Sequence, residues 1–511
     1  MLFNSFEFIL LFMPIMLIGW YGLNKIKKYK IADIFLIIMS LIFYMGFGLQ
    51  FTVVLIVSVI INYIISLIIK NSIEKEKDIQ KLSKRKMTIK IIGILFNLGI
   101  LFYFKYLDFF IENVNNVTGL GIELLGIVMP IGISFYSFQQ IAFICDRANG
   151  EQPHYNMISY FMSVFYFPKI IQGPITYCQE LIEQFDDKAK RTFNSENFNK
   201  GMILFVIGLS KKVLLADNLS KVADYGFKYT YYMDTVTVIV LMLSYAFQLY
   251  FDFSGYCDMA EGVSQMLGIK IPGNFNSPYK AASIKELWQR WHITLSRFFI
   301  RYVYIPLGGS RKGKTRTLIN VLIIFILSGL WHGAGWTYMA WGLMQGILVC
   351  IDNIGIFGIK GQEQKFLFRK KALVQIPRWL GQIGTNFWFI VSLIFFRSQD
   401  MAYAAGMFKR FFFWTWPGFF YRTAGQLDIP ENYLIKQAAS ILGIQNADNI
   451  IFTVTLLIFL IISIFVITRK NAREIANEVS LSKLQIAGLS ILFVWSFISM
   501  SQVSTFIYFA Y

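Results

Sequence analysis

Two histidines in this chain each follow a tryptophan directly, as Trp291-His292 and Trp331-His332. They are two of only three histidines among 511 residues, and His332 ends an apolar run over residues 318–330. An imidazole at membrane depth is costly to bury, so by default it is a functional residue. Histidine is also the side chain best suited to transfer a proton near neutral pH. The alternative is a histidine satisfied inside a helix bundle, but two Trp-His pairs around one basic segment favour proton-transfer chemistry.

The segment around the first pair is strongly basic. Nine lysines and arginines but only one acid, Glu286, lie between residues 280 and 316. Helical spacing separates its side chains onto two faces, with Arg290, Arg297 and Arg301 on one and Trp288, His292, Ser296 and Phe299 on the other. The arginine face fits the phosphate groups of a donor or the heads of anionic lipids, and both interpretations stay open. Neither the P-loop pattern nor the dinucleotide-binding glycine pattern occurs, so no nucleotide-binding loop is predicted.

Carboxylates also enter an apolar part of the sequence. Asp252 ends one apolar run, and Asp258 and Glu261 follow it three residues apart, on one face of a helix. Such carboxylates can orient a histidine, pair with a basic residue or cap a helix. The sequence leaves open whether Asp252 and Asp258 support catalysis or only pair structurally.

The composition defines the elements that must position these residues. Hydrophobic residues make up 56% of the chain and charged residues only 15%, which excludes an ordinary soluble protein. We predict an all-α polytopic membrane bundle, forming one domain over residues 1–511, with roughly 11–13 membrane helices. That number includes re-entrant or interfacial helices. The catalytic core is expected at about 125–345 and further spans at about 380–511. Prolines predict broken helices at 129–136 and 167–174.

The distribution of charge predicts the orientation of the bundle in the cell membrane. The net charge is +18, but the basic residues lie in short loops between apolar runs, so nucleic-acid binding is not predicted. Basic loops at 24–30, 70–90 and 469–483 are expected in the cytoplasm, with the N-terminus outside. Four cysteines lie far apart without a CxxC pair, so neither a disulfide framework nor a metal site is predicted.

Several stretches resemble the membrane-bound O-acyltransferase (MBOAT) superfamily, in its bacterial alginate O-acetyltransferase branch. They cover nearly the whole chain in family order: PIGISFYSFQQIAFICD (130–146), FPKIIQGPI (167–175), YFDFSGYCDMA (250–260), NFNSPY (274–279), LWQRWHITLSRFFIRYVYIPLGGSR (287–311), LSGLWHGAGWTYMAWG (327–342), FFRSQDMAYA (395–404) and FIYF (506–509). The two Trp-His stretches are the most specific. The resemblance implies that His332 is the invariant catalytic histidine and His292 the second functional one. It also implies a bundle thinned at its centre, where cytosolic and external funnels meet near His332.

The resemblance further implies the reaction and its participants. An acyl group, typically acetyl, would come from a cytosolic thioester, either acetyl-CoA or an acyl carrier protein, acting as co-substrate with no bound cofactor. His332 would be the base, with His292 positioning groups or relaying a proton and Trp291 and Trp331 in support. Acyl transfer also needs donors for the developing oxyanion, and backbone amides at 333–335, or Trp and Asn groups, are candidates for that role. Expected partners are membrane lipids, an extracytoplasmic acetyltransferase and an exported cell-surface polysaccharide as acceptor.

Other functions remain as alternatives. Within the superfamily, the first is transfer of D-alanine to teichoic acid. Outside it, broken spans and intramembrane charges also fit a transporter or lipid scramblase, although no inverted internal repeat is found. A polysaccharide export scaffold without catalysis is the third alternative.

Overall fold

The structure is a computed structural model of the chain. It describes residues 1–511 except 154, 416–417, 479–480 and 501–511. The FIYF stretch at 506–509, which contributed to the family resemblance, lies outside the described residues. The described chain divides into two compact units, one formed by residues 1–205, 256–273 and 294–306, and the other by residues 206–255, 274–293 and 307–511. Whether they form one functional domain stays a prediction.

The protein is a multi-pass, all-α membrane protein, as predicted. Within the described residues, seven helical segments are long and apolar enough to cross a membrane: Phe8–Lys25, Leu49–Lys75, Ile79–Thr118, Thr235–Met266, Lys314–His332, Arg378–Arg397 and Ala447–Thr468. A shorter apolar helix covers Lys483–Ser499. In a bilayer the backbone must satisfy its own hydrogen bonds, so apolar runs of this length form helices. The predicted total of 11–13 includes interfacial and re-entrant helices, and it stays a prediction.

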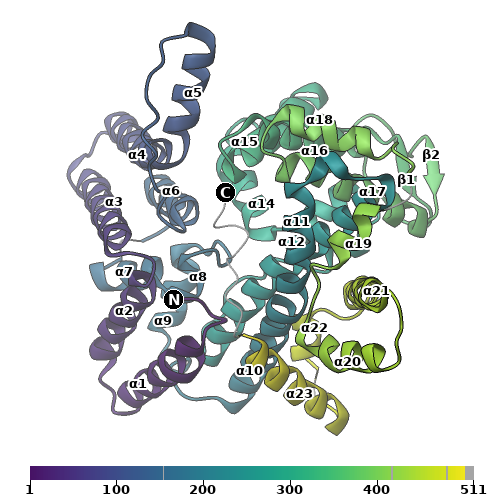
Figure 1. The fold of residues 1–511 in the computed structure, drawn as a ribbon. Helices are drawn as coiled ribbons and strands as arrows, with labels where there is room; N and C mark the ends of the chain where they lie inside the picture. Colours follow the sequence, from purple (N-terminus) through teal and green to yellow (C-terminus); the bar gives the residue numbers. More distant parts are fainter. Residues whose placement is uncertain (154, 416–417, 479–480, 501–511) are drawn as a thin grey trace. The chain divides into compact units, whose positions relative to one another are not determined.

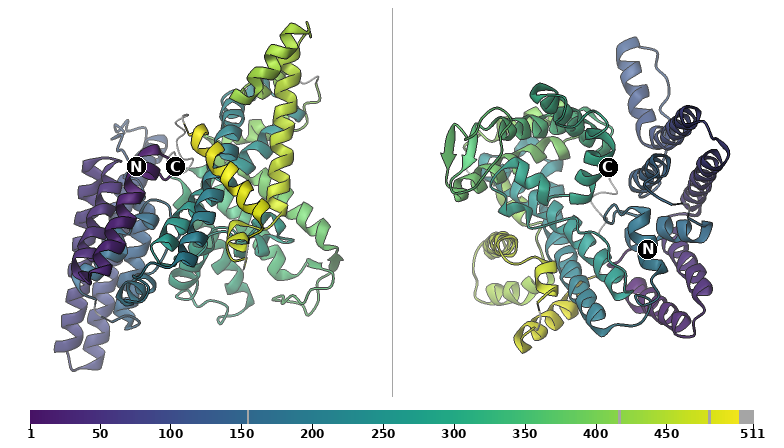
Figure 2. Two further views of the ribbon diagram at one scale, coloured as in Figure 1. Left: turned by 90° about the horizontal axis from the view of Figure 1, so that it is seen from below. Right: turned by 180° about the vertical axis from the view of Figure 1, so that it is seen from behind.

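The first unit consists of helices, among which α1 packs on α2 and α3 packs on α4 (Figures 1 and 2). Its elements are η1 (Phe8–Phe12), α1 (Met13–Lys25), α2 (Tyr29–Met45), α3 (Leu49–Lys75), α4 (Ile79–Leu101), η2 (Phe102–Tyr106), α5 (Leu107–Thr118), α6 (Ile133–Asn149), α7 (Met157–Phe165), α8 (Phe167–Ile170), α9 (Cys178–Asp186), the first part of α10 (Ser195–Ser210) and η6 (Ile300–Tyr304).

Both proline-containing stretches are broken, as predicted. Irregular backbone precedes α6 and follows α8, and every residue of 166–178 is buried. Gly132 allows the two stretches to meet, because a Cβ built there would lie 2.6 Å from the Ile170 carbonyl oxygen and its φ is +78°. Between the breaks, buried Lys169 donates a 2.6 Å hydrogen bond to Gln139 Oε1. The irregular backbone around α8 is therefore covered by protein, whereas most of the residues from 119 to 128, before α6, are exposed.

The second unit contains the remaining helices and a small sheet. Its elements are η3 (Lys211–Ala216), α11 (Asp217–Lys228), η4 (Thr230–Tyr232), η5 (Pro278–Lys280), α13 (Ile284–Arg290), α15 (Lys314–His332), α16 (Trp336–Ile354), β1 (Phe357–Ile359), β2 (Val374–Ile376), α17 (Arg378–Arg397), α18 (Met401–Arg410), α19 (Gly418–Ala424), η7 (Pro430–Asn432), α20 (Tyr433–Ile441), α21 (Ala447–Thr468), α22 (Ala472–Ala476) and α23 (Lys483–Ser499). The boundary between the units falls inside α10, α12 (Thr235–Met266) and α14 (Ile293–Phe299). Strands β1 and β2 pair in parallel.

Helices α15 and α16 form a tight antiparallel hairpin, which positions His332. Glycines allow the close approach: a Cβ built on either Gly329 or Gly342 would lie 3.2 Å from the Cα atom of the other. Gly346 continues the contact surface, against Phe325. Small residues at helix crossings let the backbones approach, which favours association inside a membrane. The hairpin therefore places His332, the last residue of α15, against α16.

Candidate active site

His332 is the last residue of α15 and lies among aromatic rings. It is 5% exposed, and its ring centroid lies 4.9 Å from Trp331, 5.3 Å from Trp341 and 5.1 Å from Phe396. All three contacts are edge-on, the preferred geometry for aromatic pairs. Helix α17 contributes Phe396, so three consecutive helices of the unit hold this imidazole. Aromatic walls of this kind exclude water and strengthen any charge interaction inside.

His292 lies at a break between two short helices. Helix α13 ends at Arg290 and α14 begins at Ile293, and the backbone φ of His292 is +45°. Such a left-handed conformation in a residue other than glycine costs about 1–2 kcal/mol and is found mostly where function requires it. The prediction of one continuous helix through this segment is wrong. The reason is tertiary, because the 274–276 backbone binds both sides of the break through Asn276 N–Arg290 O (2.9 Å) and Ile293 N–Asn274 O (3.0 Å).

His292 lies beside Trp331, so one indole contacts both predicted histidines. The His292 and Trp331 ring centroids are 5.7 Å apart. His292 Nδ1 also lies 3.1 Å from the side-chain oxygen of Asn274, and its ring contacts Phe253 of α12. The structure therefore places both sequence-predicted histidines in one aromatic cluster.

The His292 imidazole is uncharged at neutral pH. It lies outside the seven spans and is 1% exposed. Burial lowers its pKa to about 3, because the surroundings solvate the imidazolium poorly. A neutral imidazole has one nitrogen that donates and one that accepts, and only such a ring can take up a proton.

The predicted supporting residues occupy different environments. Trp291 is buried, 5.0 Å from the Phe389 ring and 6.0 Å from Tyr250. Asp252 is paired with buried Lys212 at 2.6 Å, and Lys212 also contacts Asp217 at 2.7 Å. Asp252 therefore neutralises a lysine, which was one of the two roles left open by the sequence.

Asp258 and Ser296 belong to the other unit. Both side chains are partly buried, on α12 and α14 respectively. Their predicted supporting roles stay predictions.

Each of the three predicted donor-binding arginines takes part in an ion pair. Arg297 contacts Glu180 at 2.5 Å and 3.0 Å through its two terminal nitrogens. Arg301 binds Asp146 at 3.1 Å and also contacts Glu151. Arg290 lies in the other unit, 3.0 Å from Glu286. None of these carboxylate partners was predicted, and the donor-binding role of the arginines stays a prediction.

Two of the backbone amides expected to stabilise an oxyanion already have partners. Gly333 N donates to Gly329 O at 3.3 Å, and Gly335 N donates to Gly333 O at 3.1 Å. By contrast, Trp341 Nε1 is buried and has no hydrogen-bond partner among the described residues. Its ring faces His332 at 5.3 Å with the planes at 90°. Trp341 is therefore a candidate oxyanion donor. The sequence suggested Trp groups for this role but did not single out Trp341, which lies in the second Trp-His stretch.

A cavity of about 980 Å³ lies beside α13, at the end of the α15–α16 hairpin opposite His332. Its lining includes Lys285, Gln289 and Arg290 from α13 and Asp352 from α16. Lys285 anchors α13 there, because its backbone N–H donates to Asp352 Oδ2 at 2.8 Å. On the same helix, Trp288 contacts the Trp341 ring at 5.6 Å. Trp341 in turn contacts the His332 ring at 5.3 Å.

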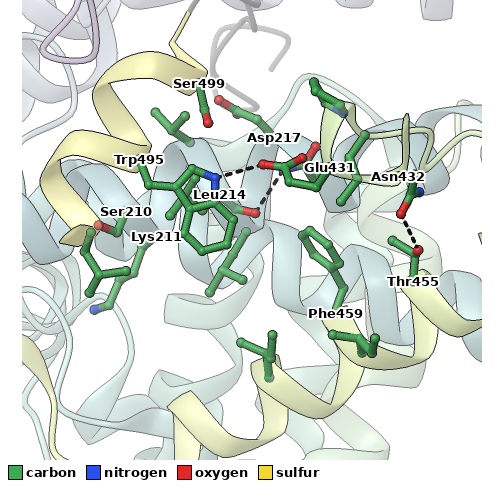
Figure 3. Close-up of a pocket in the computed structure, with 18 of the residues that line it drawn as sticks. Ser210, Lys211, Leu214, Asp217, Glu431, Asn432, Thr455, Phe459, Trp495 and Ser499 are labelled. Atoms are coloured by element: carbon green, nitrogen blue, oxygen red, sulfur yellow. Dashed lines mark hydrogen bonds between the residues drawn. The ribbon is translucent and has the colours of Figure 1, made fainter. Parts of the chain in front are cut away.

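A second cavity, of about 840 Å³, is separate from both histidines (Figure 3). Its walls come from η3, α21 and α23, and most of its lining is aliphatic. At one end Trp495 Nε1 donates to Glu431 at 2.8 Å, and Thr455 Oγ1 donates to Asn432 at 3.1 Å. No predicted site residue lines it, so it carries no part of the predicted chemistry.

Comparison with known proteins decides the family. The model of the family "MBOAT, membrane-bound O-acyltransferase family" matches residues 145–396, a range that contains both histidines. The peptidoglycan O-acetyltransferase of Helicobacter pylori is 32% identical over 542 aligned residues, which cover 100% of this chain and 97% of the relative. This chain belongs to the membrane-bound O-acyltransferase family. It is therefore an acyltransferase, as the sequence predicted.

Other MBOAT relatives differ in their distance from this chain. The probable alginate O-acetylase AlgI of Pseudomonas putida is 33% identical over 90% of this chain and 87% of its own. The teichoic acid D-alanyltransferase of Bacillus subtilis is 28% identical over 44% of this chain and 58% of its own. The similarity to the named O-acetyltransferases therefore extends over much more of the chain.

Proposed function

We propose that this MBOAT protein transfers an acetyl group from a cytosolic thioester toward hydroxyl groups of an exported cell-surface glycan. The observation that carries the proposal is the pair of histidines whose rings both contact Trp331, in a chain similar over its full length to an O-acetyltransferase. Relatives named for acetylation of peptidoglycan or alginate support a glycan acceptor. Acetyl transfer is favoured over D-alanyl transfer because the D-alanyltransferase relatives align over half of this chain or less.

His332 acts as the general base in this proposal. It takes the proton of an acceptor hydroxyl as that oxygen attacks the thioester carbonyl carbon. Collapse of the tetrahedral intermediate breaks the carbon–sulfur bond, forms the ester, and returns the proton to the departing thiolate. Trp341 Nε1 donates to the developing oxyanion, and His292 relays a proton or orients the reacting groups. The reaction needs no redox step and no bound cofactor.

The cavity beside α13 is the proposed entrance for the donor. Basic segments at 311–316 and 360–371 flank this end of the hairpin, where Lys314 Nζ lies 5.3 Å from the Phe368 ring centroid. Positive loops are retained in the cytoplasm, so this end would face the cytosol, with the N-terminus outside. Asp352 and Trp341 are eleven residues apart on α16, which is about 16 Å of helix. A flexible thioester arm entering beside Lys285 and Arg290 would run this distance to reach His332.

The decisive experiment replaces His332 with alanine. The protein is reconstituted in vesicles with a radiolabelled acetyl thioester, either acetyl-CoA or an acetylated carrier protein, and a glycan acceptor. Release of thiol and incorporation of label are measured together. A general base contributes roughly 10²–10⁴ in rate, so turnover should fall by at least that range while the protein remains folded in detergent. Near-wild-type acetylation by well-folded His332→Ala protein would exclude the proposed base.

The same variant separates the alternative functions in cells. If the protein is an acetyltransferase, the His332→Ala strain exports normal amounts of a glycan that lacks acetyl esters. A transporter or export scaffold would instead show altered export with unchanged acetylation of the glycan that is released. Release of D-alanine rather than acetate from wild-type product by mild base would favour teichoic acid modification. Gly488→Ala on α23, where an added Cβ would meet nothing within 4 Å, is the control for expression and insertion.

A further inference from the structure

The environment of His292 contains a residue that no comparison assigns to the site. Asn274 lies 18 positions earlier in the chain, is 2% exposed, and places Oδ1 3.1 Å from His292 Nδ1. An amide oxygen has no hydrogen and can only accept a hydrogen bond. The ring nitrogen that faces it must therefore carry the hydrogen. In a neutral imidazole the proton-accepting lone pair is then on Nε2.

We propose that Asn274 is a positioning residue that holds His292 as the Nδ1–H tautomer and so selects Nε2 as its proton-accepting atom. This inference rests on the proposed function for its catalytic consequence, because it concerns the histidine assigned to proton relay. Histidines at functional sites commonly have one ring nitrogen bound to a fixed partner, which sets the tautomer and the ring orientation. Here the partner is an uncharged amide, which fixes the tautomer without adding a negative charge that would favour the imidazolium.

The backbone around Asn274 has the rigidity that such a role requires. Its carbonyl accepts from Ile293 N at 3.0 Å, so the main chain of Asn274 binds the backbone next to His292 while its side chain contacts the imidazole. Asn276 N donates to Arg290 O at 2.9 Å and completes the contact between the two segments. The left-handed backbone at His292 turns its ring away from the path that a continuous helix would give it. The strained conformation and the Asn274 contact therefore act together to set one ring orientation.

The other face of His292 is aromatic. Phe253 contacts the ring at 4.9 Å with an interplanar angle of 77°, and Trp331 contacts it at 5.7 Å and 71°. Edge-on packing from two helices restricts the movement of the ring. A change of the Asn274 side chain should therefore alter the tautomer of His292 while the ring stays in place.

Nitrogen NMR tests the inference directly, because the chain has only three histidines. Protein labelled with ¹⁵N-histidine and purified through a tag without histidine is reconstituted in lipid at pH 7. The His292 signals are identified from their loss in His292→Gln. The expected spectrum has a protonated Nδ1 and an unprotonated Nε2 at His292. A protonated Nε2 with an unprotonated Nδ1 in the wild-type protein would overturn the proposal, whatever the variants do.

Two substitutions then separate positioning from a purely structural role. Asn274→Leu removes the acceptor at similar size, so Nε2–H signal should appear at His292, and Asn274→Asp retains an acceptor, so Nδ1 should stay protonated. Asn320→Leu is the matched control, since Asn320 is also fully buried in this unit but binds the Gly309 carbonyl. It should leave the His292 spectrum unchanged. An unchanged His292 spectrum in folded Asn274→Leu would refute the role of Asn274.

Acetyl-transfer kinetics supply the functional part of the test. At metal sites, loss of the partner that orients a histidine costs about 10–100-fold. By analogy, Asn274→Leu should lower kcat by about that factor with little change in the donor KM. If the tautomer shifts as expected and kcat does not fall, the catalytic consequence of the inference is wrong. The proposed acetyl transfer is tested separately by His332→Ala, so the two failures can be told apart.

Discussion

The α15–α16 hairpin gives a quantitative test of how His332 is positioned. Gly329 lies one turn before His332, and a Cβ built there would come closer than 3.0 Å to the Tyr338 carbonyl oxygen and within 3.2 Å of Gly342 Cα. Ordinary Cβ contacts begin near 3.4 Å. Gly329→Ala must therefore move the backbones of α15 and α16 apart by at least about 0.4 Å where Gly329 faces Tyr338. Both partner atoms belong to the backbone of α16, so no side-chain rotation can relieve the overlap.

The expected effect is larger on turnover than on folding. Overpacking of this kind costs typically about 1–3 kcal/mol of stability. Catalytic groups must be held within about 0.5 Å of their working positions, and a 1 Å displacement can cost about 10²-fold in rate. Turnover should therefore fall by about ten- to one-hundred-fold in Gly329→Ala protein that still purifies as a folded monodisperse species.

The assay compares acetyl transfer and thermal unfolding in detergent for Gly329→Ala and a control. Gly488→Ala on α23 is the matched control, because a Cβ there would meet nothing within 4 Å. It should leave both measurements unchanged. Wild-type turnover and wild-type thermal stability in Gly329→Ala would refute the argument that close helix packing positions His332.

Three further predictions concern topology, donor binding and the oxyanion. Single cysteines placed in the loops at 24–30, 70–90 and 469–483 should stay unmodified by an impermeant reagent in intact cells, because these basic loops are expected in the cytoplasm. The four native cysteines are buried, and labelling at 70–90 would overturn the predicted orientation. The double change Arg297→Lys and Arg301→Lys should raise the apparent donor KM, because lysine cannot bind phosphate bidentately. Unchanged donor dependence would contradict the donor role, and Arg85→Lys, at an exposed position on α4, is the control. Trp341→Phe removes the proposed oxyanion donor and should lower kcat by about 10²–10³-fold without changing KM. The control is Trp379→Phe at an exposed position, and a normal kcat in Trp341→Phe would exclude Trp341 as an oxyanion donor.

The sequence by itself determined the membrane character, the family and the two histidines. Apolar runs long enough to span a bilayer must become helices, because lipid offers the backbone no hydrogen-bond partners. This constraint is local, so apolar runs such as 51–69 and 450–468 could be read directly from residue order. The two Trp-His pairs stood out for a similar reason, since histidine is rare in this chain and each lies in a distinctive short stretch.

The tertiary structure decided what surrounds those histidines. Periodicity alone predicted one helix through Arg290, His292 and Arg297, yet hydrogen bonds from the 274–276 backbone interrupt it at His292. Glu180 lies 117 positions from its partner Arg297, and no local pattern in the sequence indicates that pairing. Local rules describe how a segment folds alone, but a buried polar group takes whichever partner the packed chain brings to it. For His292 that partner is Asn274, which therefore became visible only when the two segments were placed side by side.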